Sequence, residues 1–150
     1  METYFLKTPA AESDPRFSPD GNWIAYISNE AGRSEVYIRP FAGKPAGPAG
    51  KLQVSHNGGM QAVWGPLGRE IFYLSADGSV FAADTRNLGR TETLPTPVRL
   101  LRSCLIDLQR QAGPWFDTRD GDKFLIVSRG PARSVHRVDE LDSADEPTMR

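Results

Sequence analysis

The chain has 150 residues, with 18 Lys and Arg residues against 19 Asp and Glu residues, and a formal net charge of -1. This balance argues against a nucleic-acid-binding protein that relies on a basic surface. Hydrophobic residues make up 39% of the chain and charged residues 25%, which is typical of one globular domain rather than a disordered segment. No apolar run reaches the roughly 20 residues of a membrane-spanning helix, so we expect no membrane insertion.

The cysteine count and the first residues bear on the compartment. One cysteine, Cys104, excludes an internal disulfide and a zinc site built from several cysteines. No secretory signal opens the chain, because Met1-Glu2-Thr3 is followed only by the short apolar group Tyr4-Phe5-Leu6. This favours the cytoplasm for the chain as given, although it does not fix the localisation.

Three related turns organise the sequence. They are Ser18-Pro19-Asp20-Gly21, Gly65-Pro66-Leu67-Gly68 and Thr118-Arg119-Asp120-Gly121, and their last glycines lie 47 and 53 residues apart. Serine at the first position, proline at the second and glycine at the fourth suit a type I turn. A period near 40 to 50 residues with strand-forming residues after each turn indicates propeller blades. We expect Asp20 and Asp120 to accept backbone N–H bonds rather than bind calcium, because the spacing of an EF-hand loop is absent.

Short β-rich runs lie before and after every turn. The runs directly after the turns are apolar on both faces, which favours strands buried between neighbouring sheets. Only residues 101–111 could form a helical turn or two. The Gly- and Pro-rich stretch 43–51 predicts a flexible or polyproline-like connection. In chain order, the predicted strands are 15–17, 23–28, 35–39, 51–55, 61–64, 71–75, 79–83, 97–101, 114–117, 124–128 and 134–138.

The stretch Phe17-Ser18-Pro19-Asp20-Gly21-Asn22-Trp23-Ile24-Ala25-Tyr26 resembles the PD40 repeat (a WD40-like repeat) of TolB-like β-propellers. Residues 28–41 make the resemblance more specific, because together with the first stretch they are similar to the C-terminal propeller of bacterial receptor-like serine/threonine protein kinases. Residues 69–74 and 116–125 continue the resemblance, which covers about residues 4 to 138. The sequence departs from the repeat at Leu67, where the repeat prefers Asp, and in the third turn, which lacks Ser-Pro. The nucleotide loop and the catalytic motifs of a kinase do not occur in the sequence.

We therefore expect an all-β fold of four-stranded antiparallel propeller blades, about three of them, spanning residues 1–138. The charges of residues 139–150 predict an acidic, mobile tail. Closed rings have about four to eight blades, so three blades leave two explanations open. Two chains form a six-bladed ring, in which residues 3–7 of each chain complete the last blade of the other, or the chain is a piece of a longer propeller.

No residue pattern singles out a catalytic, cofactor or metal site. A Gly-x-Ser-x-Gly nucleophile elbow is absent from the sequence, so we expect no enzyme. His56 and His136 lie far apart without a pair of cysteines and give weak support for a metal site. Cys104 is expected to be a small buried hydrophobe. Each repeat carries one tryptophan that we expect to pack between blades: Trp23, Trp64 and Trp115.

The resemblance implies a non-catalytic protein-interaction, sensor or scaffold module without a cofactor. Similar propellers bind protein partners through loops on the ring faces and through the central channel, and they are often periplasmic or extracellular. Two alternatives remain. The chain is a propeller fragment that gates a prolyl-oligopeptidase-like peptidase encoded elsewhere, or it is a truncated remnant without independent activity.

Overall fold

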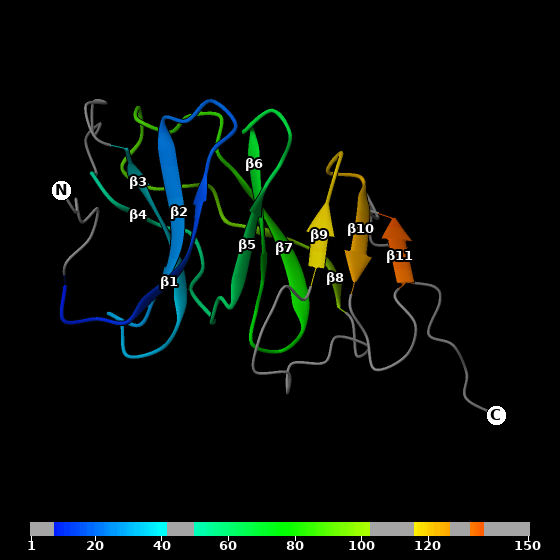
Figure 1. The fold of residues 1–150 in the computed structure, drawn as a ribbon, viewed down its shortest axis with the longest axis horizontal. Helices are drawn as coiled ribbons and strands as arrows, with labels where there is room; N and C mark the ends of the chain where they lie inside the picture. The colour runs from blue at the N-terminus through cyan, green and yellow to red at the C-terminus, as the bar shows by residue number, and fades with distance from the viewer. Residues whose placement is uncertain (1–7, 42–49, 103–115, 127–132, 137–150) are drawn as a thin grey trace, which may run out of the picture.

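The computed structural model describes residues 8–41, 50–102, 116–126 and 133–136. These residues form eleven β-strands in three antiparallel sheets and contain no α-helix. Consistent with this, no membrane-spanning helix occurs in the described part of the chain. Figure 1 shows the three sheets side by side in chain order, as expected for the blades of a partial propeller.

Each sheet is a meander in which strands adjacent in the chain pair with one another. The first sheet contains β1 (Glu12–Phe17), β2 (Trp23–Ser28), β3 (Glu35–Pro40) and β4 (Leu52–Gln53). The second sheet contains β5 (Gln61–Trp64), β6 (Glu70–Leu74), β7 (Ser79–Asp84) and β8 (Val98–Arg102). The third sheet contains β9 (Phe116–Thr118), β10 (Lys123–Ile126) and β11 (Arg133–His136).

The turn between β1 and β2 shows why the repeated sequence forms a tight hairpin. The Ser18 hydroxyl accepts a bond from the Trp23 amide at 3.0 Å, and the Gly21 amide donates to the Ser18 carbonyl at 2.8 Å. Gly21 has a φ of 69°, a conformation that costs glycine little because it has no Cβ. The serine and the glycine of the motif therefore fix the turn together.

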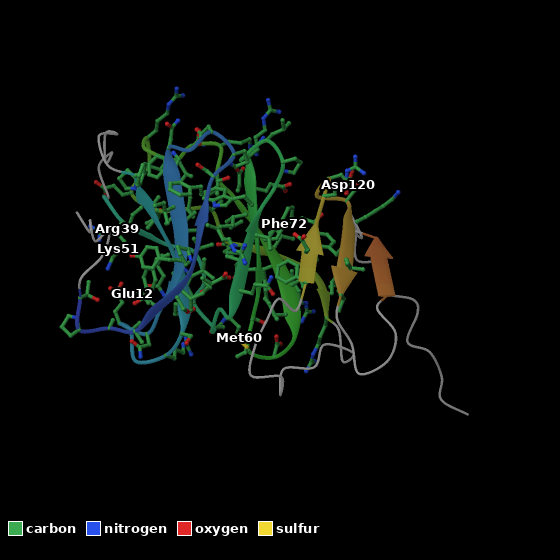
Figure 2. The ribbon with its side chains drawn as sticks, in the orientation of Figure 1. Glu12, Arg39, Lys51, Met60, Phe72 and Asp120 are labelled. Carbon is green, nitrogen blue, oxygen red and sulfur yellow. The ribbon has the colours of Figure 1, made fainter. Side chains whose placement is uncertain are left out.

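Two apolar layers join the three sheets, and β6 contributes to both. Ile71 and Tyr73 face the first sheet, whereas Phe72 and Leu74 face the third. Phe72 lies edge-to-face against Phe124 with ring centroids 5.1 Å apart, and Figure 2 shows it between the second and third sheets. Burial of each such side chain contributes about 1.5–3 kcal/mol, so these layers hold the blades side by side.

The all-β fold with antiparallel four-stranded sheets is confirmed for the first two sheets, and the third has three strands within the described residues. The expectation of strands buried on both faces is confirmed for β2 and β6 and is wrong for β10. Leu125 on β10 is 52% exposed, because no described sheet lies against that face. In the expected helical region, residues 101 and 102 belong to β8, and the remainder lies outside the described residues, as do residues 3–7 and 139–150.

Candidate functional site

The first strands of the three sheets enclose a groove of about 360 Å³. Arg16 and Phe17 line it from β1, residues 61–64 from β5, and Phe116 and Asp117 from β9. Each of these strands is the first strand of its repeat in the chain. The groove therefore lies where a propeller has its inner strands. A concave site between packed elements is the usual place for a ligand.

Hydrogen bonds between the sheets fix the walls of this groove. The Trp64 indole Nε1 donates to the Arg16 carbonyl at 3.1 Å and joins β5 to β1. The Gln61 carboxamide joins β5 to β9, because its Nε2 donates to the Phe116 carbonyl at 2.7 Å and its Oε1 accepts from the Phe116 amide at 3.2 Å. These bonds make the walls rigid before any ligand binds.

Phe17 provides the main apolar surface of the groove. Its side chain is 58% exposed and packs edge-to-face against Phe41, with ring centroids 5.0 Å apart. Val63 is half-buried and lines the same groove. Because exposed aromatic surface next to a hollow gains free energy when it is covered, this end of the groove suits an apolar group of a ligand.

The two charged residues of the groove differ in how they are paired. The Arg16 guanidinium binds the Asp14 carboxylate, with Nη2 2.8 Å and Nε 3.0 Å from Oδ1. Asp14 reaches it from an irregular part of β1, where its φ is 51°. Asp117 accepts the Thr118 amide through Oδ1 at 2.9 Å, and within the described residues its Oδ2 has no bond. Among the described residues, the groove therefore has a cation at β1 that is paired with Asp14 and a carboxylate at β9 that has no cationic partner.

The aspartates of the turns are bound to their own turns. Asp20 accepts from the Ser18 hydroxyl at 2.5 Å and from the Asn22 amide at 3.0 Å, which lowers its pKa. The amides of Lys123 and Asp122, at 2.8 and 3.0 Å, lower the pKa of Asp120 in the same way. The predicted role of Asp20 and Asp120 as acceptors of backbone bonds is confirmed. In the described part of the chain, no group of three or more His, Cys, Asp or Glu residues is placed to hold a metal ion.

A second turn of the same kind joins β6 to β7. Asp77, which follows β6, accepts a bond from the Ser75 hydroxyl and one from the Ser79 amide at 2.9 Å. The Ser75 bond is the larger cause of the lowered pKa of Asp77. The hairpin between β6 and β7 thus uses the same serine and aspartate chemistry as the turn between β1 and β2.

A buried carboxylate, Glu35, lies at the start of β3 and is 1% exposed. It accepts bonds from the Ser55 hydroxyl, from the Gly58 amide and from the Arg33 Nε at 2.6 Å. Gly59 follows this contact, and a Cβ there would lie 2.6 Å from Val36 Cγ2. The network therefore anchors the loop that leads from the first sheet to β5, and its bonds suit a structural role.

Of the other residues singled out in the sequence, Trp64 lines the groove, whereas His56 and Trp23 lie outside its lining. His56 is exposed, and its carbonyl accepts a bond from Arg33. His136 lies on β11, and Cys104 and Trp115 lie outside the described residues. Packing between blades is confirmed for Trp64, which is buried between the first two sheets, and for Trp23, which packs against the same core.

Part of this chain is similar in sequence to a known protein. A segment of 71 residues, 47% of this chain, is 34% identical to Tricorn protease homolog 1 of Streptomyces coelicolor, and it spans 6% of that protein. No protein-family model matches the chain. The similarity connects the chain weakly with a protein named as a protease homologue, and it provides no support for catalysis by this chain.

Sequence reasoning did not find the groove, although the repeat offered a way to do so. The residues directly before each turn, 16–17, 63–64 and 116–117, hold equivalent positions in the repeat and all line the groove. Glu35 was also missed, because a glutamate at the start of a strand is ordinarily exposed. Its burial depends on Ser55 and Gly58, which are distant in the sequence.

Proposed function

We propose that this chain is a non-catalytic protein-binding module made of propeller blades, and that its partner occupies the groove between β1, β5 and β9. The observation that carries this proposal is the exposed Phe17 beside walls held by Gln61 and Trp64. A rigid groove loses little entropy on binding, and an aromatic side chain supplies the contact area typical of a binding hot spot. The resemblance of the repeats to TolB-like and kinase-associated propellers supports a sensor or scaffold role.

Peptide binding by the full chain tests this proposal. An array of synthetic nonapeptides, varied in apolar and charged residues, is incubated with the labelled protein, and the dissociation constant of the best peptide is measured by fluorescence polarisation. We expect Phe17→Ala to weaken binding at least tenfold. The control Val98→Ala removes a side chain that is 64% exposed and outside the groove lining, and it should leave binding unchanged. If no peptide binds, or if both variants bind like the parent chain, the proposal is wrong.

The similarity to a protease homologue supports one alternative, in which the groove passes peptides to a peptidase encoded elsewhere. In that case, the full chain should form a stable complex with a peptidase. Adding the chain to that peptidase should then change which lengths of peptide the peptidase cleaves fastest. Phe17→Ala should reverse the change. A partner without peptidase activity would favour the sensor or scaffold role.

A further inference from the structure

We propose that a second hollow, which lies between the first two sheets beside their turns, binds a partner peptide segment that carries an acidic side chain next to an apolar one. Arg69 binds the carboxylate of this segment, and Leu67 packs against its apolar side chain. The hollow shares no lining residue with the groove between β1, β5 and β9, so the inference goes beyond the proposed function.

The hollow has a volume of about 470 Å³. It is lined by the turn between β1 and β2, by Trp23 at the start of β2, by the turn between β5 and β6, and by the segment that follows β7. Figure 1 shows the two turns at the same end of their sheets. Loops that a rigid sheet holds in place are a common location for binding sites, so this end of the two blades is suited to contact a partner.

Hydrogen bonds and close packing hold the walls of the hollow. The Thr85 hydroxyl donates to the Gly68 carbonyl at 2.8 Å, and the Thr85 amide donates to the Arg69 carbonyl at 2.9 Å. The second turn is thereby fixed to the segment after β7. It also packs on the first turn, because a Cβ at Gly68 would lie 3.4 Å from Pro19 Cδ. A hollow with fixed walls loses little entropy when a ligand binds.

The two turns differ at their third position. In the first turn, the Asp20 carboxylate accepts bonds from the Ser18 hydroxyl at 2.5 Å and from the Asn22 side-chain amide at 2.7 Å. Leu67 holds the same position in the second turn, and its side chain is 74% exposed. A leucine side chain has no acceptor for such bonds, so Leu67 does not stabilise its turn as Asp20 does.

The second turn closes without the Leu67 side chain, because the Gly68 amide donates to the Gly65 carbonyl at 2.9 Å. The half-buried Trp23 and Leu88 line the same hollow as Leu67. The three side chains offer apolar surface at one place, and covering such surface on binding is favourable. The hollow is therefore suited to an apolar side chain of a partner.

The charged side chains of the hollow define the second requirement. The Arg86 guanidinium is bound to both carboxylate oxygens of Asp84, with Nε 3.0 Å from each. The exposed Arg69 guanidinium makes no hydrogen bond or ion pair among the described residues. A guanidinium forms strong paired bonds with a carboxylate, so Arg69 favours an acidic side chain. One unpaired guanidinium beside apolar surface fits a peptide, whereas a nucleic acid needs a row of cations for its phosphates.

The experiment uses the full chain and two sets of fluorescent nonapeptides, with binding measured by fluorescence polarisation. Each peptide of the first set has one glutamate and one leucine, placed one to three residues apart among glycines and serines, and the second set has glutamine in place of glutamate. We expect the best glutamate peptide to bind about threefold to fivefold more tightly than its glutamine twin at low salt, as an exposed ion pair allows. The preference should shrink as salt is added.

Two variants test the assigned residues. Arg69→Gln should abolish the preference for glutamate, whereas Arg90→Gln makes the same change at an exposed arginine outside the lining and should keep it. Leu67→Ser should weaken both peptides of the pair about fivefold, because it removes apolar contact area. Val98→Ser changes another exposed apolar side chain outside the lining and should leave binding unchanged.

Three results would overturn the inference. The first is that no glutamate peptide binds more tightly than its glutamine twin. The second is that the preference for glutamate survives Arg69→Gln. The third is binding that is lost in Phe17→Ala and kept in Leu67→Ser, which would assign the peptide to the groove and leave the proposed function in place.

Discussion

The backbone amide of Gly58 donates to both carboxylate oxygens of Glu35, at 3.0 and 3.1 Å, and so joins two segments 23 residues apart. The Ser55 hydroxyl also donates to this carboxylate and accepts a bond from the Val36 amide at 2.8 Å. The loop that ends at β5 is thereby fixed to the start of β3. Because β5 forms one wall of the groove, a buried network in the first sheet positions a strand of the second.

Glu35→Ala should lower the free energy of unfolding by about 2–3 kcal/mol, because the Ser55 hydroxyl and the Gly58 amide lose their acceptor while they remain buried. Glu35→Gln should cost less, since one carbonyl oxygen still accepts a bond. Urea unfolding followed by tryptophan fluorescence measures both values. The exposed Glu92, changed to alanine, should cost less than about 0.5 kcal/mol. Equal stability of the Glu35→Ala and Glu92→Ala chains would show that the network does not anchor the loop.

Gln61→Leu should loosen the third sheet from the second. The leucine fills much of the same volume but leaves the Phe116 amide and carbonyl without their partner, at a cost of about 2–3 kcal/mol. We expect hydrogen exchange to speed up in β9 and β10 and to remain unchanged in β2 and β3, which lie in the first sheet. Uniform acceleration over all three sheets would contradict a local role for Gln61 and indicate general destabilisation.

The turn aspartates predict a loss of stability in acid. The pKa values of Asp20, Asp77 and Asp120 are lowered in the folded chain, chiefly by hydroxyl bonds at the first two and by amide bonds at the third. Their contribution is therefore complete above about pH 4, where these carboxyls ionise in the unfolded chain, and it is lost as the pH falls toward the folded values.

A chain with Asp20→Asn and Asp77→Asn should be less stable near neutral pH and should show a flatter decline of stability below about pH 4. Urea unfolding between pH 3 and pH 7 measures this. The control is Asp122→Asn, which alters an exposed aspartate whose side chain makes no bond among the described residues. A parallel decline in both variants would mean that other carboxyls dominate acid unfolding.

Local chemistry explains how much of the fold could be predicted. Strands 23–28 and 61–64 have the predicted bounds, because turn residues flank apolar runs at these places. The apolar pattern of residues 124–128 predicted a strand covered on both sides, yet Leu125 on β10 is exposed. The sequence of a strand indicates which side chains are suited to burial, whereas their actual burial requires a neighbouring sheet.

The groove could not be predicted from local patterns, because it depends on contacts between distant segments. Trp64 and Arg16 are 48 residues apart, and Gln61 and Phe116 are 55 residues apart. The repeat places residues 16–17, 63–64 and 116–117 at equivalent positions, but it does not predict that a glutamine side chain bridges two strands. An alignment of the residues before each turn identifies residues that line the groove, but it does not identify the hydrogen bonds that join the strands.

The strand count bears on assembly. The outer strands β4 and β8 precede β5 and β9 in the chain, so residues 3–7 hold the chain position of an outer strand before β1. Within the described residues, the third sheet has three strands and β11 lies at its edge. We propose that residues 3–7 of a second copy pair with this edge, and that two chains close a six-bladed ring.

Light scattering after size-exclusion chromatography, over a dilution series, measures the mass of the assembly. We expect a dimer that persists at micromolar concentration, because closing a ring buries the end faces of both chains. Phe5→Asp should convert it to a monomer, since a charge within the pairing strand opposes its burial. Val98→Asp, at an exposed position of β8, should leave the dimer intact. A parent chain that remains monomeric throughout would exclude the two-chain ring and favour a piece of a longer propeller.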